Sequence, residues 1–283
     1  ISSSDIGFRV APRLNATGRF GKHEIAMRLL FTRSVAEARK IALEMNELNS
    51  RRQHMVDVMF AKAVELFEAR PGFEKEKIIV LAHSSWHKGL VGLVASKLAE
   101  RYGVPALAGA IEEDVITGSG RSIPEFDLIK NPEPVHELLS RFGGHAQACG
   151  FELPVARLSE LRDRLLKIAA QALPDEVLLK GHRVDAALDL DVLDNAFAAQ
   201  YKQLEPFGNG NEMPLFHAIN LQLLETPMLL KEKHLKLKLR QDGGTNSFYA
   251  LMWNAADRYE ELQSGRRLEA VFSIMFNRWR GNE

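Results

Sequence analysis

The chain has 283 residues, of which 46% are hydrophobic, and this is enough for two compact units with separate cores. The chain has 37 Lys and Arg residues and 37 Asp and Glu residues, so it has no net positive charge that would attract nucleic acid or membrane. Any binding of nucleic acid must therefore come from local basic patches and should weaken as salt rises. The single cysteine, Cys149, excludes an internal disulfide and favours a reducing, cytoplasmic location, and no apolar run approaches the ~20 residues that span a bilayer.

Residues 5–30 are predicted to be mostly turn, followed by a short helix over 22–30. Pro12 and Gly18 interrupt the pattern, and both residues are frequent in turns. The polar residues Arg13, Asn15 and Arg19 lie in this stretch. By pattern alone, they serve only to cap and tie the turn.

Residues 34–69 are predicted to form one long helix. The segment is free of Gly and Pro, Ser34 is a suitable N-cap, and Pro71 and Gly72 end it. At ~1.5 Å per residue such a helix spans about 50 Å, enough to separate two domains. Its charges, including Arg51 and Arg52, are assigned to a solvated face.

Residues 77–110 fit a strand–helix–strand unit, with strands over 77–82 and 105–110 and an amphipathic helix over 89–102. A loop containing His87 precedes the helix. The free N–H groups of a helix N-terminus make phosphate binding reasonable there, although His87 on a plain surface loop explains the pattern equally well.

Two glycine-rich segments between residues 117 and 150 are the main candidates for a ligand site. We predict both to be turns, because glycine permits positive φ and close approach to a ligand. Arg121 can grip a phosphate with two parallel donors, and His145 can donate to a phosphate oxygen. The segments are Gly118-Ser119-Gly120-Arg121-Ser122 and Gly143-Gly144-His145. Each alone is weak evidence.

A strand over 151–154 and a helix over 158–173 complete an α/β layer structure that ends near Pro174. After residue 180 the pattern changes to short alternating strands, which predict a small β-barrel. In the strand over 234–240, alternation places one basic set on a single face: His234, Lys236, Lys238 and Arg240. With Trp253 and Trp279 downstream, this face suits single-stranded nucleic acid, but lysines on a strand also simply block edge pairing.

A metal site is not evident in the sequence. Asp185, Asp189 and Asp191 share strand parity, but an outward acidic face is the simpler explanation. No predicted site residue is therefore assigned to a metal.

Four motifs, in order, resemble the RecJ family of the DHH superfamily. They are Ala-Pro-Arg-Leu-Asn-Ala-x-Gly-Arg at 11–19, Trp-His-x-Gly-x-x-Gly at 86–92, the two glycine-rich segments, and Glu-Pro-Phe-Gly-Asn-Gly at 205–210. Cys149 stands where the family usually has alanine. The resemblance implies the tail of a DHH domain over 1–32, a connecting helix over 33–72, a DHH-associated α/β domain over 73–175 and a β-barrel OB-fold over 176–283, with both ends of the chain cut from a longer protein.

The resemblance also implies the substrate-binding part of a metal-dependent 5′→3′ single-stranded-DNA exonuclease of repair and recombination. It gives His145 and Arg121 catalytic roles. It assigns phosphate binding to the remaining residues of the two glycine-rich segments and, in addition, to His87, Arg13, Asn15 and Arg19. Mn²⁺ or Mg²⁺ would be held by an upstream domain, and a helicase or single-strand-binding protein would be partners. Two alternatives remain: a phosphodiesterase for oligoribonucleotides or cyclic dinucleotides, and a non-catalytic nucleic-acid-binding module.

Overall fold

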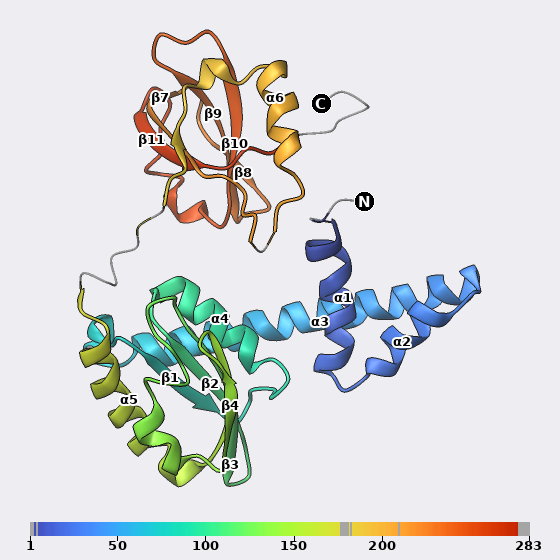
Figure 1. The fold of residues 1–283 in the computed structure, drawn as a ribbon, viewed down its shortest axis with the longest axis vertical. Coiled ribbons are helices and arrows are strands. Elements are labelled where there is room, and N and C mark those ends of the chain that lie inside the picture. Colours follow the sequence, from blue (N-terminus) through green and yellow to red (C-terminus); the bar gives the residue numbers. More distant parts are fainter. Residues whose placement is uncertain (1–2, 4, 176–180, 182, 209, 277–283) are drawn as a thin grey trace. The chain divides into compact units, whose positions relative to one another are not determined.

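The computed structural model describes residues 3, 5–175, 181, 183–208 and 210–276. The chain divides into two compact units, one of Ser4–Lys180 and one of Gly181–Glu283 with Ile1–Ser3 (Figure 1). No helix among the described residues has the length and apolar character needed to cross a membrane.

The first unit begins with the helices η1 (Asp5–Val10), α1 (Ala11–Arg19), α2 (His23–Phe31) and α3 (Val35–Glu68). Of these, η1 and α1 lie where turns were predicted, whereas α2 and α3 lie where helices were predicted. Pro12 does not break α1 because it lies in the first turn, where a missing N–H costs nothing. Gly18 lies one residue before the helix ends, where its low helix propensity matters little. The turn prediction was therefore wrong for residues 5–19, and the helix predicted over 22–30 is confirmed by α2.

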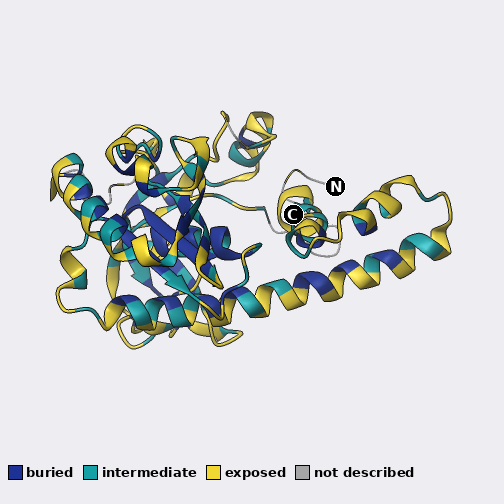
Figure 2. Ribbon diagram, turned by 90° about the horizontal axis from the view of Figure 1, so that it is seen from below, coloured by how far each residue is buried: buried dark blue, intermediate teal, exposed yellow. Residues whose placement is uncertain are grey.

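The long helix α3 is present and links two hydrophobic cores. Ser34 caps it by accepting a hydrogen bond from the Glu37 N–H at 3.3 Å. Its first half packs Ile41 and Met45 against α1 and α2, while its second half contributes Met59 and Phe67 to the core of the α/β region. Figure 2 shows the resulting buried stripe alternating with exposed residues along the helix.

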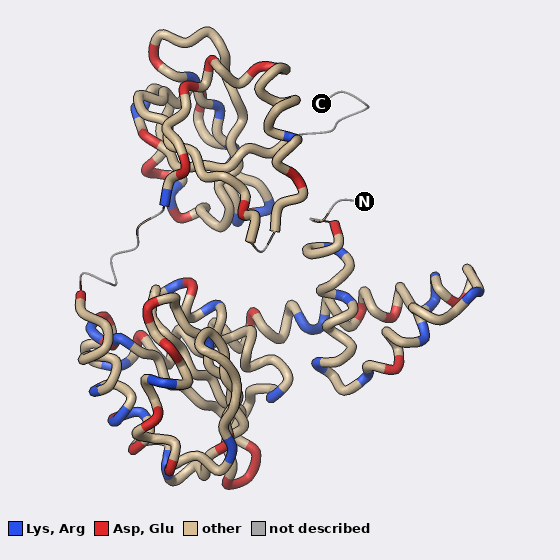
Figure 3. Tube along the Cα trace, in the orientation of Figure 1, with Lys and Arg blue, Asp and Glu red and all other residues tan. Residues whose placement is uncertain are grey.

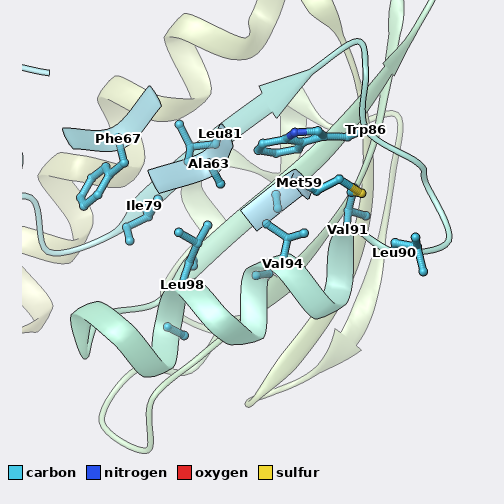
Figure 4. Close-up of a cluster of buried hydrophobic side chains, with 14 of the residues drawn as sticks. Met59, Ala63, Phe67, Ile79, Leu81, Trp86, Leu90, Val91, Val94 and Leu98 are labelled. Carbon is cyan, nitrogen blue, oxygen red and sulfur yellow. The ribbon is translucent and has the colours of Figure 1, made fainter. Parts of the chain in front are cut away.

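A five-stranded sheet forms the centre of the α/β region. Its elements are β1 (Ile79–His83), α4 (Val91–Tyr102), β2 (Ala106–Glu112), β3 (Val115–Arg121), β4 (Arg141–His145), β5 (Ala148–Pro154) and α5 (Leu158–Ala172), with the strands in the order β1-β2-β3-β5-β4. Only β1 and β2 are parallel, as their connection through α4 requires. Helices α3 and α4 cover one face around Trp86 and Leu98 (Figure 4), and α5 covers the other.

The second unit is a six-stranded sheet with short helices. Its elements are β6 (Ala186–Ala187), η6 (Leu190–Val192), α6 (Asn195–Tyr201), β7 (Phe216–Leu223), β8 (Met228–Leu230), β9 (His234–Gln241), β10 (Ser247–Met252) and β11 (Arg267–Phe272). Leu235, Leu237 and Leu239 of β9 point into its core, as the alternation predicted. The path β10-β9-β7-β11 has two unpaired ends among the described residues, so the predicted barrel is not closed there.

Candidate functional site

The two glycine-rich segments are strands, not turns. Gly118 and Gly120 lie inside β3, and Gly143 and Gly144 lie inside β4. A Cβ added at Gly118 would lie 2.1 Å from Cζ of the Phe151 ring, and one at Gly120 would lie 2.6 Å from the sulfur of Cys149. These glycines in β3 are therefore required by packing on the face of the sheet that α5 covers.

The other face of the same strands carries the polar residues in register. Arg121 of β3 and His145 of β4 both pair with Ala148 of β5, which lies between them. Residues paired across strands point to the same side, and two strand spacings separate the Cα atoms of Arg121 and His145 by roughly 10 Å. Between the arginine and the histidine, Ala148 contributes only a methyl group.

The next row on this face carries almost no side chains. Ser119 pairs with Gly150, which pairs with Gly143. A Cβ at Gly143 or Gly150 would have no atom within 4 Å, so packing does not require glycine at either position. The row forms a flat, exposed floor beside Arg121 and His145, where the backbone can approach a ligand closely.

The N-terminus of α4 borders this face. A Cβ at Gly92, in the first turn of α4, would lie 2.9 Å from Nη2 of Arg121 and 3.2 Å from Oγ of Ser119. Arg121 also donates from Nη1 to Oγ of Ser119 and to the carbonyl of Gly120, both at 2.7 Å. The arginine is thus held against a helix end whose partial positive charge favours anions.

Helix α1 brings a second arginine to the same place. Arg19 donates from Nη1 to the carbonyl of Gly89 at 3.1 Å, in the loop before α4. The helix approaches so closely that a Cβ at Gly89 would lie 2.2 Å from the Arg19 carbonyl oxygen. The pKa of Arg19 is lowered, first by burial and then by repulsion from Arg52 and Arg121. Arg52 could not be singled out from the sequence, because helical spacing alone does not tell which face of α3 another helix will cover.

The remaining predicted phosphate-binding residues are placed differently. Arg13 donates from Nε to Oδ1 of Asn46 at 2.5 Å, which holds α1 on α3, and Asn15 is exposed on α1. Nδ1 of His87 accepts the Gly89 N–H at 3.1 Å, and the ring packs edge-on against Phe20. Ser122 donates to the carbonyl of Phe126 at 2.5 Å. The structure therefore gathers Arg19, Ser119, Arg121 and His145, and leaves Arg13 tied to α3.

In the second unit, cations of β9 lie beside aromatic rings of β10 and its following turn. The ammonium groups of Lys236 and Lys238 lie 3.9 and 5.7 Å from the ring centroid of Tyr249, which is 60% exposed. The His234 ring meets the exposed Trp253 edge-on at 4.9 Å. Arg240 is exposed at the end of the same face, and Trp279 lies outside the described residues. Figure 3 shows charges of both signs interspersed along each unit, so this face depends on a local cluster.

The three aspartates at the start of the second unit hold backbone groups. Asp185 accepts the Leu215 N–H at 2.9 Å, Asp189 accepts the Asp191 N–H at 3.1 Å, and Asp191 accepts two N–H groups of the β9–β10 loop. The described part of the chain contains no group of three or more His, Cys, Asp or Glu residues that could hold a metal ion. The residues described do not fit a divalent-metal centre.

Comparison with known proteins identifies both units. The family model of the DHHA1 domain matches residues 75–173, and that of the RecJ OB domain matches 184–283. The single-stranded-DNA-specific exonucleases RecJ of Bacillus subtilis and Thermus thermophilus are each 32% identical to it, over 97% and 98% of this chain but 35% and 38% of their own lengths. Crystal structures of Thermus thermophilus RecJ with Mg²⁺ and with Mn²⁺ match with TM-scores of 0.79 at 30% identity, over 99% of this chain and 42% and 40% of theirs. The chain spans half or less of the length of the curated relatives it matches.

Proposed function

Since the chain belongs to the RecJ family, we propose that it is the substrate-holding part of a single-stranded-DNA exonuclease that works 5′→3′ in DNA repair and recombination. The observation that carries the proposal is the convergence of Arg19, Ser119, Arg121 and His145 around the Gly143–Gly150 floor at the N-terminus of α4. Guanidinium groups, a hydroxyl, an imidazole and a helix end are all donors that phosphate oxygens accept.

Each group has a role that follows from its position. Arg121, held against α4 and Ser119, would grip a phosphate by two donors, and Arg19, held on the loop before α4, would add a second positive charge. His145, roughly 10 Å across the floor, would donate to a neighbouring oxygen or an adjacent phosphate. The flat glycine floor would support the sugar or base between them.

Hydrolysis needs a metal centre that this chain does not supply from its described residues. Divalent metals polarise the phosphodiester and activate water. The RecJ structures with Mg²⁺ and Mn²⁺ support a divalent metal in the intact enzyme, and we place its ligands in the portion of those proteins that this chain does not span. This chain alone should bind single-stranded DNA without cutting it.

The β9–β10 face would guide the single strand. Lysines follow a phosphate backbone, and exposed rings such as Tyr249 and Trp253 stack on bases of any sequence. The matched OB domain favours a polymer over a cyclic dinucleotide as substrate. A cytoplasmic location, and a helicase or single-strand-binding protein as partner, belong to the same proposal.

The test is incubation of the whole chain with 5′-labelled single-stranded DNA and Mn²⁺, with binding and cleavage read together. Arg121→Ala and Lys236→Ala should each weaken binding about tenfold or more, because a charge-assisted hydrogen bond or a stacked cation is lost. Arg157→Ala is the control, since Arg157 is exposed and forms an ion pair with Glu160 at 3.7 Å, away from the proposed site residues.

Two outcomes would contradict the proposal. Digestion by the purified chain would show that its residues do hold a metal. Binding that is insensitive to both substitutions but lost in the control would place the DNA elsewhere on the chain.

A further inference from the structure

Arg52 of α3 does not lie on a solvated face as predicted. It is half-buried, and its Nε atom is buried without a hydrogen-bond partner in the described structure. Burial is the main cause that lowers its pKa. The carboxylate that acts against this shift, Asp57, also forms an ion pair with Lys97 at 2.9 Å.

The packing of α1 on α3 explains why Arg52 lies here. Helix α1 crosses α3 (Figure 1), and the two are joined by the Arg13–Asn46 hydrogen bond and by the contact of Arg51 with the Phe20 ring at 5.4 Å. The residue before Phe20 is Arg19, which reaches the carbonyl of Gly89. The C-terminal end of α1 therefore brings Arg19 beside the turn of α3 that carries Arg52.

Arg19, Arg52 and Arg121 form a cluster of like charge. Arg52 and Arg121 both repel the charge of Arg19. Within the described parts of the chain, none of the three is in an ion pair, although many other arginines are. Partly buried cations that form no ion pair lower stability, and such a group of charges is typical of a functional site rather than of packing.

We propose that Arg52 is a third phosphate-binding arginine, and that an oxyanion bound between it, Arg19 and Arg121 supplies the acceptor and the negative charge that the cluster lacks. The inference rests on the phosphate site proposed above and adds to it a residue from α3. The connecting helix would then contribute directly to substrate binding, in addition to separating the two cores.

Thermal unfolding of the whole chain in sodium phosphate and in sodium chloride of equal ionic strength tests this. An anion that binds only the folded state raises the Tm as its concentration rises. Arg52→Met keeps the length and apolar packing of the side chain, so in chloride it should unfold at the same or a higher temperature because the repulsion is gone. Its apparent affinity for phosphate should fall about tenfold or more. Arg52→Lys, which keeps a charge but loses the planar donors, should lie between.

Two reference variants make the outcomes separable. Arg39→Met, on an exposed position of α3, should keep the full phosphate shift, and Arg121→Met should lose it. A loss in Arg121→Met with a full shift in Arg52→Met would overturn the role of Arg52 and leave the proposed function standing. A wild-type chain with no phosphate-specific shift would overturn both. A lower Tm of Arg52→Met in chloride with unchanged phosphate affinity would show that Arg52 is structural.

Discussion

At the residue scale, the glycines of the sheet serve two different purposes. Gly118 is packed against Phe151, whereas Gly143 faces open space on the opposite side. Gly118→Ala should destabilise the fold by about 1–3 kcal/mol, because the added methyl overlaps the ring. Gly143→Ala should change the free energy of unfolding by less than about 0.5 kcal/mol and still weaken binding of single-stranded DNA. Urea unfolding and a binding titration measure both; equal stability losses would refute the distinction.

The lone cysteine gives a second prediction at this scale. Cys149 is buried, and burial raises the pKa of its thiol. The thiolate is the reactive form, so the folded chain should react with a thiol reagent far more slowly than the unfolded chain. Labelling followed across a urea titration should therefore coincide with loss of the near-ultraviolet signal. Rapid labelling without denaturant would mean that β5 opens locally.

At the scale of elements, the site depends on how α1 meets the loop before α4. Gly89→Ala forces a Cβ toward the carbonyl oxygen of Arg19 and should displace the end of α1. We expect weaker binding of single-stranded DNA with the α/β core intact, since Gly89 lies at its margin. Gly18→Ala is the matched control: a Cβ at Gly18 would have no atom within 4 Å, and Gly18 lies next to the end of α1, so the substitution should change the free energy of unfolding little and preserve binding. Unchanged binding in Gly89→Ala would separate Arg19 from the site.

At the scale of the whole molecule, the chain is formally neutral, so nucleic-acid binding must come from local clusters. The logarithm of affinity for single-stranded DNA should fall linearly with the logarithm of salt concentration. The reason is that Lys and Arg side chains that contact phosphates displace the counterions bound to the DNA. Lys236→Ala should reduce that slope by about 0.7, the value for one phosphate contact on a single strand. Lys167→Ala, exposed on α5, should leave the slope unchanged. An equal change in both would indicate non-specific attraction.

Local pattern was sufficient where one signal dominated. The long helix α3, the β1–α4–β2 unit and the alternation of Leu235, Leu237 and Leu239 were all predicted, because helix propensity, strand alternation and a terminal Pro-Gly pair agree there. The pattern failed at α1 and in β3 and β4, where proline and glycine indicated turns. Pro12 occupies a helix first turn and Gly118 a tightly packed strand, and both contexts are set by neighbours distant in sequence.

Residue types were enough to nominate the candidate phosphate-binding side chains, and the ordered motifs were enough to identify the family. Which of those side chains lie close together depends on the fold. Strand register places Arg121 and His145 in one row, and the packing of α1 against α3 and the α4 loop adds Arg19 and Arg52 while it keeps Arg13 on α3. A side chain's neighbours across a sheet or a helix contact come from segments that are distant in the sequence, so no local pattern contains them. Their close approach here also depends on the absence of a Cβ at Gly89 and Gly92, where one would meet Arg19 and Arg121.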